Sequence, residues 1–195
     1  MTELGHPITA EQAIERYSGL RWSDCHRAIQ ADSGLAVDLP KLKACVHRMV
    51  ADRAADVPAI GGIGAFLEAQ SGRVLAIASS SDREWLDSSL ERLGLRRHFG
   101  DHVFSAAGIP RGKPHPDVYL GVAKALGIPP SRCLVIEDHP VGVAAGASAG
   151  MTVVALLAAS HIRSGHEALV RSAGARHVAR DYRQVSEILS ELEAG

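Results

Sequence analysis

The sequence predicts an α/β protein in which a parallel sheet is flanked by helices. From about residue 61 onward, short apolar runs alternate with amphipathic segments. This alternation is typical of a parallel sheet with helices on both faces. Residues 1–60 contain no β-branched run and carry helix-start signals instead. The pattern therefore predicts two domains, a helical one over 1–60 and an α/β one over 61–195.

The first sixty residues predict three helices. Thr9 and Gln12 fit a capping box, in which each side chain accepts a hydrogen bond from the amide of the other residue. Ser23 is expected to cap a second helix that ends at Gly34. Pro40 suits the first turn of a third helix, because proline needs no amide partner there.

The remainder of the chain alternates strands with helices. Short, continuously apolar runs such as 73–79 are typical of parallel strands that are buried on both faces. In chain order, the predicted elements are strand 73–79, a helix closed by Gly94, strand 103–105, helix 117–126, strand 133–136, helix 141–149, strand 152–156, helix 166–173, strand 177–179 and a last helix from Tyr182. Because ligands bind at the carboxyl ends of parallel strands, functional residues are expected at these ends.

Composition and charge argue against several classes of protein. Lys and Arg total 21 against 22 for Asp and Glu, and no basic block predicts a nucleic-acid surface. No apolar run approaches the ~20 residues of a membrane span, and the first residues do not read as a signal peptide. The cysteines, Cys25, Cys45 and Cys133, form no C-x-x-C pair, which favours a cytoplasmic protein with reduced thiols. Nothing in the sequence indicates an oligomeric state.

Serine residues end the strand predicted at 73–79. Ser79 and Ser80 are followed at once by the start of a helix. A hydroxyl group at a strand tip, together with helix amides, can cradle a phosphate group. The alternative is a plain helix cap formed by Ser81 or Asp82.

Two adjacent carboxylates, Glu137 and Asp138, end the strand predicted at 133–136. Such a pair repels itself unless a cation neutralises it, and Mg²⁺ prefers one or two carboxylates together with water and phosphate oxygens. The alternative is again a cap, here for the helix that contains Gly142.

A single lysine, Lys113, lies between Gly112 and Pro114 in a chain with only four lysines against seventeen arginines. Its compact ammonium group can hold a phosphate oxygen and offset a carboxylate. The alternative is a solvated loop lysine.

Taken together, these motifs resemble the haloacid dehalogenase superfamily, in the branch of β-phosphoglucomutase-like enzymes and sugar-phosphate phosphatases. The match rests on segments 76–81, 112–117 and 135–138, with Gly142 following at the expected spacing. The resemblance implies a Rossmann-like parallel sheet, with residues 1–60 as a partial helical cap. It also implies that Ser79, Ser80 and Lys113 bind phosphate, that Glu137 and Asp138 bind Mg²⁺, and that the cap loop at Gly19 and Arg21 reaches the substrate.

The catalytic motif of that superfamily, D-x-D-G-[TV] on an N-terminal strand, has no counterpart in this chain. Among its eleven aspartates, no two are spaced i, i+2. The resemblance therefore implies that the nucleophile and the central first strand are missing from the chain. The strands ending at Ser79 and Glu137 would flank that strand, so they are not expected to pair directly. Without the nucleophile carboxylate, Lys113 is expected to contact Glu137 or Asp138.

By resemblance, the parent activity is Mg²⁺-dependent hydrolysis of a small phosphorylated metabolite, such as a sugar phosphate, through an aspartyl-phosphate. The chain as given is expected to be inactive, because the nucleophile is absent. Two alternatives remain open: a phosphomutase on the same scaffold, and a non-catalytic remnant that binds phosphate or a partner protein. His139, which follows the paired acids, is interpreted as a helix-start residue rather than a residue near the metal.

Overall fold

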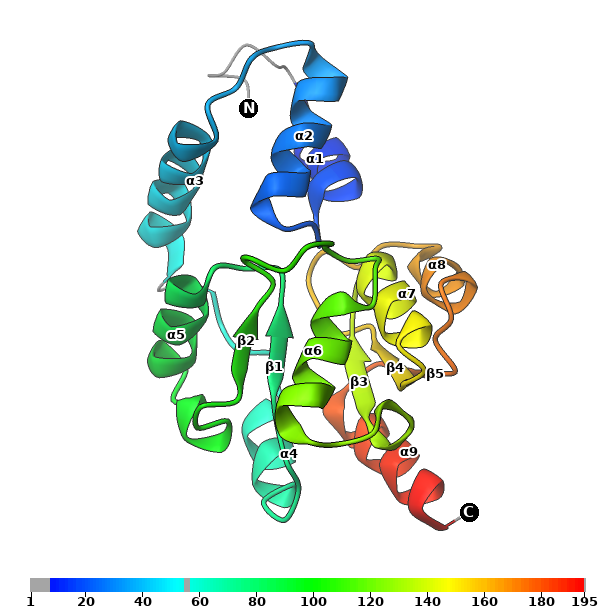
Figure 1. Cartoon of the computed structure of the whole chain (residues 1–195). Helices are drawn as coiled ribbons and strands as arrows, with labels where there is room; N and C mark the ends of the chain where they lie inside the picture. The colour runs from blue at the N-terminus through cyan, green and yellow to red at the C-terminus, as the bar shows by residue number, and fades with distance from the viewer. Residues whose placement is uncertain (1–7, 55–56, 195) are drawn as a thin grey trace. The chain divides into compact units, whose positions relative to one another are not determined.

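The computed structural model describes residues 8–54 and 57–194, and the chain divides into two compact units between Pro58 and Ala59. The first unit is helical and the second is α/β (Figure 1). No helix in the described part of the chain is long and apolar enough to span a membrane.

The helical unit contains α1 (Ala10–Tyr17), α2 (Trp22–Ser33) and α3 (Leu39–Ala54). The capping box of α1 is confirmed, because the Gln12 amide donates to Thr9 Oγ1 at 3.2 Å and the Thr9 amide donates to Gln12 Oε1 at 3.0 Å. Pro40 lies in the first turn of α3, as expected. The small core of this unit is built around Tyr17, Ile29 and Leu42.

The start of α2 differs from the prediction. The cap residue is Arg21, and its side chain makes no capping hydrogen bond, so the expected cap at Ser23 is wrong. Arg21 Nε instead donates to Asp24 Oδ2 at 2.7 Å, and this ion pair joins the cap residue to the first turn of the helix. The other end is confirmed, since Gly34 closes α2 in the left-handed region at φ 67°.

The α/β unit alternates strands and helices along its length. Its elements are α4 (Ile63–Ala69), β1 (Ile77–Ser79), α5 (Arg83–Arg92), η2 (Arg96–His98), β2 (Val103–Ser105), α6 (Asp117–Leu126), η3 (Pro130–Arg132), β3 (Leu134–Glu137), α7 (Pro140–Ser148), β4 (Thr152–Leu156), α8 (His166–Ser172), β5 (His177–Ala179) and α9 (Tyr182–Ala194). The predicted alternation is confirmed.

All strand pairs in this unit are parallel, and they form two separate ladders. One joins β1 to β2, with Ser79 opposite Ser105, and the other joins β3, β4 and β5 in that order. In the described chain, β1 and β3 therefore belong to different sheets, which confirms the expectation that they do not pair directly. The first strand is shorter than the predicted 73–79, because β2 offers only three partner residues to it.

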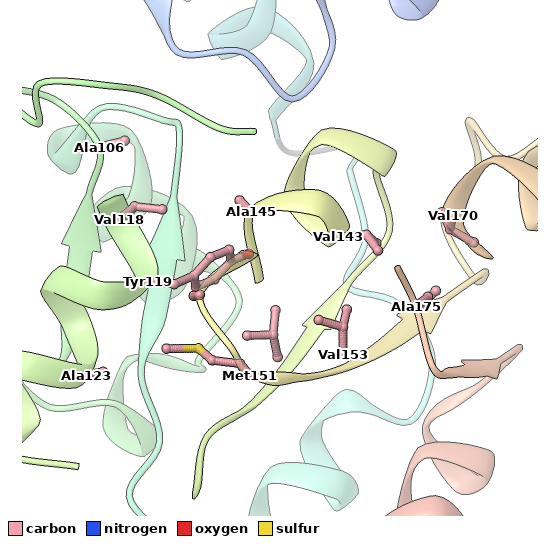
Figure 2. Close-up of a cluster of buried hydrophobic side chains, with 13 residues drawn as sticks. Ala106, Val118, Tyr119, Ala123, Val143, Ala145, Met151, Val153, Val170 and Ala175 are labelled. Atoms are coloured by element: carbon pink, nitrogen blue, oxygen red, sulfur yellow. The ribbon is translucent and has the colours of Figure 1, made fainter. Parts of the chain in front are cut away.

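Hydrophobic cores lie on both faces of these strands. One is made by side chains from α6, α7 and α8, including Tyr119, Val143 and Val170, packed on Val153 of β4 (Figure 2). The other is made by α4, α5 and α9 against Val154. Adjacent residues of β4 thus point into opposite cores, as alternation along a strand requires. The predicted α/β fold, parallel strands flanked by helices, is confirmed.

Candidate active site

Apart from Lys113, the predicted site residues of the α/β unit lie at the carboxyl ends of the strands. Ser79 is the last residue of β1, Glu137 is the last residue of β3, and Asp138 follows it directly. Lys113 lies in the segment between β2 and α6.

Lys113 is buried at the centre of this group, with 6% of its side chain exposed. Its Nζ donates to Glu137 Oε1, which confirms the expected contact with the paired acids. The same Nζ lies 3.4 Å from the carbonyl oxygen of Ala78, the residue before Ser79. It also lies 4.8 Å from the centre of the Tyr119 ring. Lys113 therefore links the end of β1 to the end of β3, and it is not a solvated loop lysine.

The carboxylate of Glu137 is held by several donors. Tyr119 Oη donates to Oε1 at 2.7 Å, and the Asp138 amide donates to Oε2 at 3.1 Å. Burial raises the pKa of Glu137, but the Lys113 ammonium and these hydrogen bonds outweigh burial, so the pKa lies below its ordinary value. Burial and the Glu137 charge raise the pKa of Tyr119, so its hydroxyl group stays protonated and donates. The site therefore presents a fixed, ionised carboxylate.

Gly142 makes room for this carboxylate. It lies in the first half of α7, and a Cβ atom built on it would overlap the carboxylate of Glu137. The backbone of Gly142 is not in the left-handed region, so close approach is the reason for glycine here. The sequence pattern singled out Gly142 by its spacing alone, without this role.

The hydroxyl group of Ser79 faces the turn that starts α5. Ser79 Oγ accepts a hydrogen bond from the Ser81 amide at 3.1 Å. The N-cap of α5 is Asp82, whose side chain makes no capping hydrogen bond. The alternative of a plain side-chain cap is therefore not what the structure shows. Ser80, which lies between Ser79 and Ser81, is half-buried at the same strand end.

Asp138 is the more open of the two acids, with 40% of its side chain exposed. Burial and the neighbouring Glu137 charge raise the pKa of Asp138. Neither acid caps α7, because its N-cap is His139, whose Nδ1 accepts from the Val141 amide at 3.4 Å. The interpretation of His139 as a helix-start residue is confirmed.

Two further histidines approach Asp138, and the sequence analysis missed both. His166 Nε2 lies 2.6 Å from the Asp138 carbonyl oxygen, and His161 Nε2 lies 3.7 Å from Asp138 Oδ2. His161 belongs to the segment between β4 and α8, and His166 is the first residue of α8. β4 also ends at this edge, but His161 and His166 lie five and ten residues beyond its last residue, Leu156, in a segment without a motif, so the strand-end rule did not single them out.

The two cap-loop candidates lie in the other unit. Gly19 has a left-handed backbone at φ 76°, and Arg21 is the N-cap of α2, with 12% of its side chain exposed and paired to Asp24.

The donor set suits a hard cation with open coordination positions. Mg²⁺ needs only one or two carboxylates, with water and phosphate oxygens for the rest, and Glu137 and Asp138 offer these. Residues 8–54 and 57–194 contain no group of three or more His, Cys, Asp or Glu side chains placed to enclose a metal.

A family model for haloacid dehalogenase-like hydrolases matches residues 35–150. The chain therefore belongs to the haloacid dehalogenase-like hydrolases, as the resemblance of its motifs implied.

Among curated proteins, 6-phosphogluconate phosphatase of Escherichia coli (strain K12) is 28% identical over 162 residues, covering 82% of this chain and 72% of that protein. The protein SUPPRESSOR OF QUENCHING 1, chloroplastic, of Arabidopsis thaliana is 36% identical over 115 residues, covering 59% of this chain but only 10% of that protein. The chain thus spans a small part of one of these relatives and most of the other.

Among solved structures, a HAD family hydrolase from Deinococcus radiodurans R1, crystallised with bound phosphate and sodium, is 30% identical. The similarity has a TM-score of 0.71 and covers 97% of this chain and 84% of that one.

Proposed function

We propose that this chain binds the phosphate group of a small phosphorylated metabolite, such as a sugar phosphate, next to a Mg²⁺ ion. The observation that carries the proposal is the buried Lys113–Glu137 ion pair at the meeting point of two strand ends, with Ser79 and Asp138 beside it. The family membership, the phosphatase among the relatives and the phosphate held by the Deinococcus hydrolase support it.

The proposed roles follow from the chemistry of each side chain. Ser79, Ser80 and the amides at the start of α5 would donate to phosphate oxygens. Lys113 would neutralise phosphate charge as a point cation. Glu137 and Asp138 would hold Mg²⁺, which supplies positive charge to the phosphoryl oxygens when it is bound.

The helical unit is proposed as a partial cap that contributes to substrate choice. In this proposal, Gly19 and Arg21 lie in the loop that meets the substrate. Arg21 Nε donates to Asp24 Oδ2 at 2.7 Å, so a neighbour fixes the position of its guanidinium group. The three free cysteines fit a cytoplasmic site of action.

The hydrolysis that the family resemblance implies uses an attacking carboxylate and a general acid in addition to these groups. The chain has no aspartate pair with the spacing that the family uses for them. We therefore propose that the 195-residue chain binds its ligand but does not hydrolyse it. A phosphomutase would use the same phosphate and metal groups and would need the same nucleophile.

The purified 195-residue chain is expected to show no Mg²⁺-dependent hydrolysis of a panel of sugar phosphates above the background of a protein-free control. Phosphate release would be measured with Mg²⁺ and with EDTA. EDTA-sensitive turnover above that background would contradict the proposal and mean that another residue is the nucleophile.

A further inference from the structure

Several histidine side chains surround Asp138, although a magnesium site uses oxygen ligands and needs no imidazole nitrogen. Three imidazoles lie near one another, those of His139 before α7, His161 in the segment between β4 and α8, and His166 at the start of α8. The His166 ring centre lies 6.5 Å from that of His139 and 5.9 Å from that of His161.

Two of these imidazoles are engaged by the backbone. A carbonyl oxygen only accepts hydrogen bonds, so His166 Nε2 must donate to the Asp138 carbonyl oxygen. His139 Nδ1 accepts from the Val141 amide. Both rings therefore fix the backbone around Asp138 rather than offering those nitrogens to a ligand.

His161 differs from them. Its Nε2 is buried and makes no hydrogen bond, although 25% of the side chain is exposed. A buried nitrogen without a partner costs free energy. This nitrogen lies 3.7 Å from Asp138 Oδ2, which is beyond hydrogen-bond distance but within ion-pair distance when the imidazole is protonated.

That separation suits two ligands of one metal ion. Bonds of about 2.1 Å to nitrogen and oxygen at a tetrahedral angle place the two ligand atoms about 3.4 Å apart. The observed 3.7 Å is only slightly wider. Because 40% of the Asp138 side chain is exposed, water can reach this carboxylate to complete the coordination of an ion.

The geometry points to a second mode of metal binding, in which Asp138 and His161 together hold a borderline transition-metal ion such as Zn²⁺ or Co²⁺. Imidazole nitrogen suits these ions, whereas Mg²⁺ prefers oxygen ligands. The inference rests on the proposed function, because it takes Asp138 as a metal-binding carboxylate. It implies that Zn²⁺ competes with Mg²⁺ at Asp138.

Calorimetric titration of metal-free protein with Zn²⁺ and with Mg²⁺ tests this inference. The wild-type chain should bind one Zn²⁺, and added Mg²⁺ should weaken that binding. His161→Ala should lower the Zn²⁺ affinity at least about tenfold, since even indirect partners of a metal ligand are worth about 10–100-fold. The same variant should change the Mg²⁺ affinity by less than about twofold, and Asp138→Asn should weaken both ions.

His98→Ala is the matched control, because His98 Nε2 is also buried without a hydrogen bond but lies in η2. It should change neither affinity. His161→Gln provides a second variant of similar side-chain length if the alanine variant does not fold, as judged by circular dichroism. The Co²⁺ complex adds a spectroscopic readout, because its visible absorption changes when a nitrogen ligand is lost.

Equal Zn²⁺ affinity in the wild type and His161→Ala, or no Zn²⁺ binding by the wild type, would overturn the inference and leave the magnesium proposal intact. Unchanged Mg²⁺ affinity in Asp138→Asn would instead contradict the proposed function itself.

Discussion

Replacing Lys113 with methionine is expected to destabilise the metal-free protein by about 3–5 kcal/mol, because the Glu137 carboxylate then stays buried without its cation. Only 6% of the Lys113 side chain and 12% of the Glu137 side chain are exposed, so solvent screens this pair weakly. Methionine keeps most of the length and apolar bulk of the lysine stem, so the charge is the main change. The measurement is urea-induced unfolding in EDTA.

Two further variants make this result specific. Lys124→Met removes an exposed lysine from α6 and should change stability by no more than about 0.5 kcal/mol. The double variant Lys113→Met with Glu137→Gln removes both charges and should recover much of the loss, since an uncompensated charge is the costly species. A Lys113→Met variant as stable as Lys124→Met would show that the buried ion pair does not hold the two strand ends together.

Gly142→Ala is expected to destabilise the protein by about 1–3 kcal/mol, as overpacking in a filled site does. The added Cβ atom would overlap the Glu137 carboxylate, so either this carboxylate or α7 must move. Helix propensity acts in the opposite direction, because alanine is favoured over glycine by about 1 kcal/mol inside a helix. The free-energy cost of the steric overlap must therefore exceed the gain in helix propensity. Thermal or urea unfolding measures the net effect.

Gly121→Ala is the matched control for this substitution. Gly121 lies within α6, where an added Cβ atom would meet nothing within 4 Å, and its backbone is not left-handed. That variant should be more stable than the wild type by about 0.5–1 kcal/mol. If both alanine variants are stabilised, Gly142 is not needed for the approach of Glu137.

Most of the fold could be predicted from local patterns in the sequence. The bounds of β4, Thr152–Leu156, and of α6, Asp117–Leu126, agree with the pattern, because continuous apolar runs and helical spacing are signals within a single segment. The error at β1 has a different origin. Residues 74–76 are as apolar as a strand requires, but the length of a strand depends on its partner, and β2 contributes three residues.

The candidate site was only partly predictable for the same reason. The contact between Lys113 and Glu137 could be expected, because the resemblance places the lysine and the paired acids in one site and the nucleophile carboxylate is absent from the chain. The approach of His161 and His166 to Asp138 follows from the path of the chain after β4, which carries no motif. The role of Gly142 depends on the side chain of Glu137, five residues earlier, whose carboxylate lies against the backbone of α7. Such contacts belong to the tertiary structure.

The central claim is that Ser79, Lys113 and Asp138 together form a site that binds phosphate with Mg²⁺. Calorimetric titration of inorganic phosphate into the wild-type chain, with Mg²⁺ and then with EDTA, tests it most directly. We expect phosphate binding that Mg²⁺ strengthens, and that Ser79→Ala weakens at least about tenfold, as the loss of a charge-assisted hydrogen bond would. Phosphate binding that is indifferent to Mg²⁺ and unchanged in Ser79→Ala and Asp138→Asn would contradict the account.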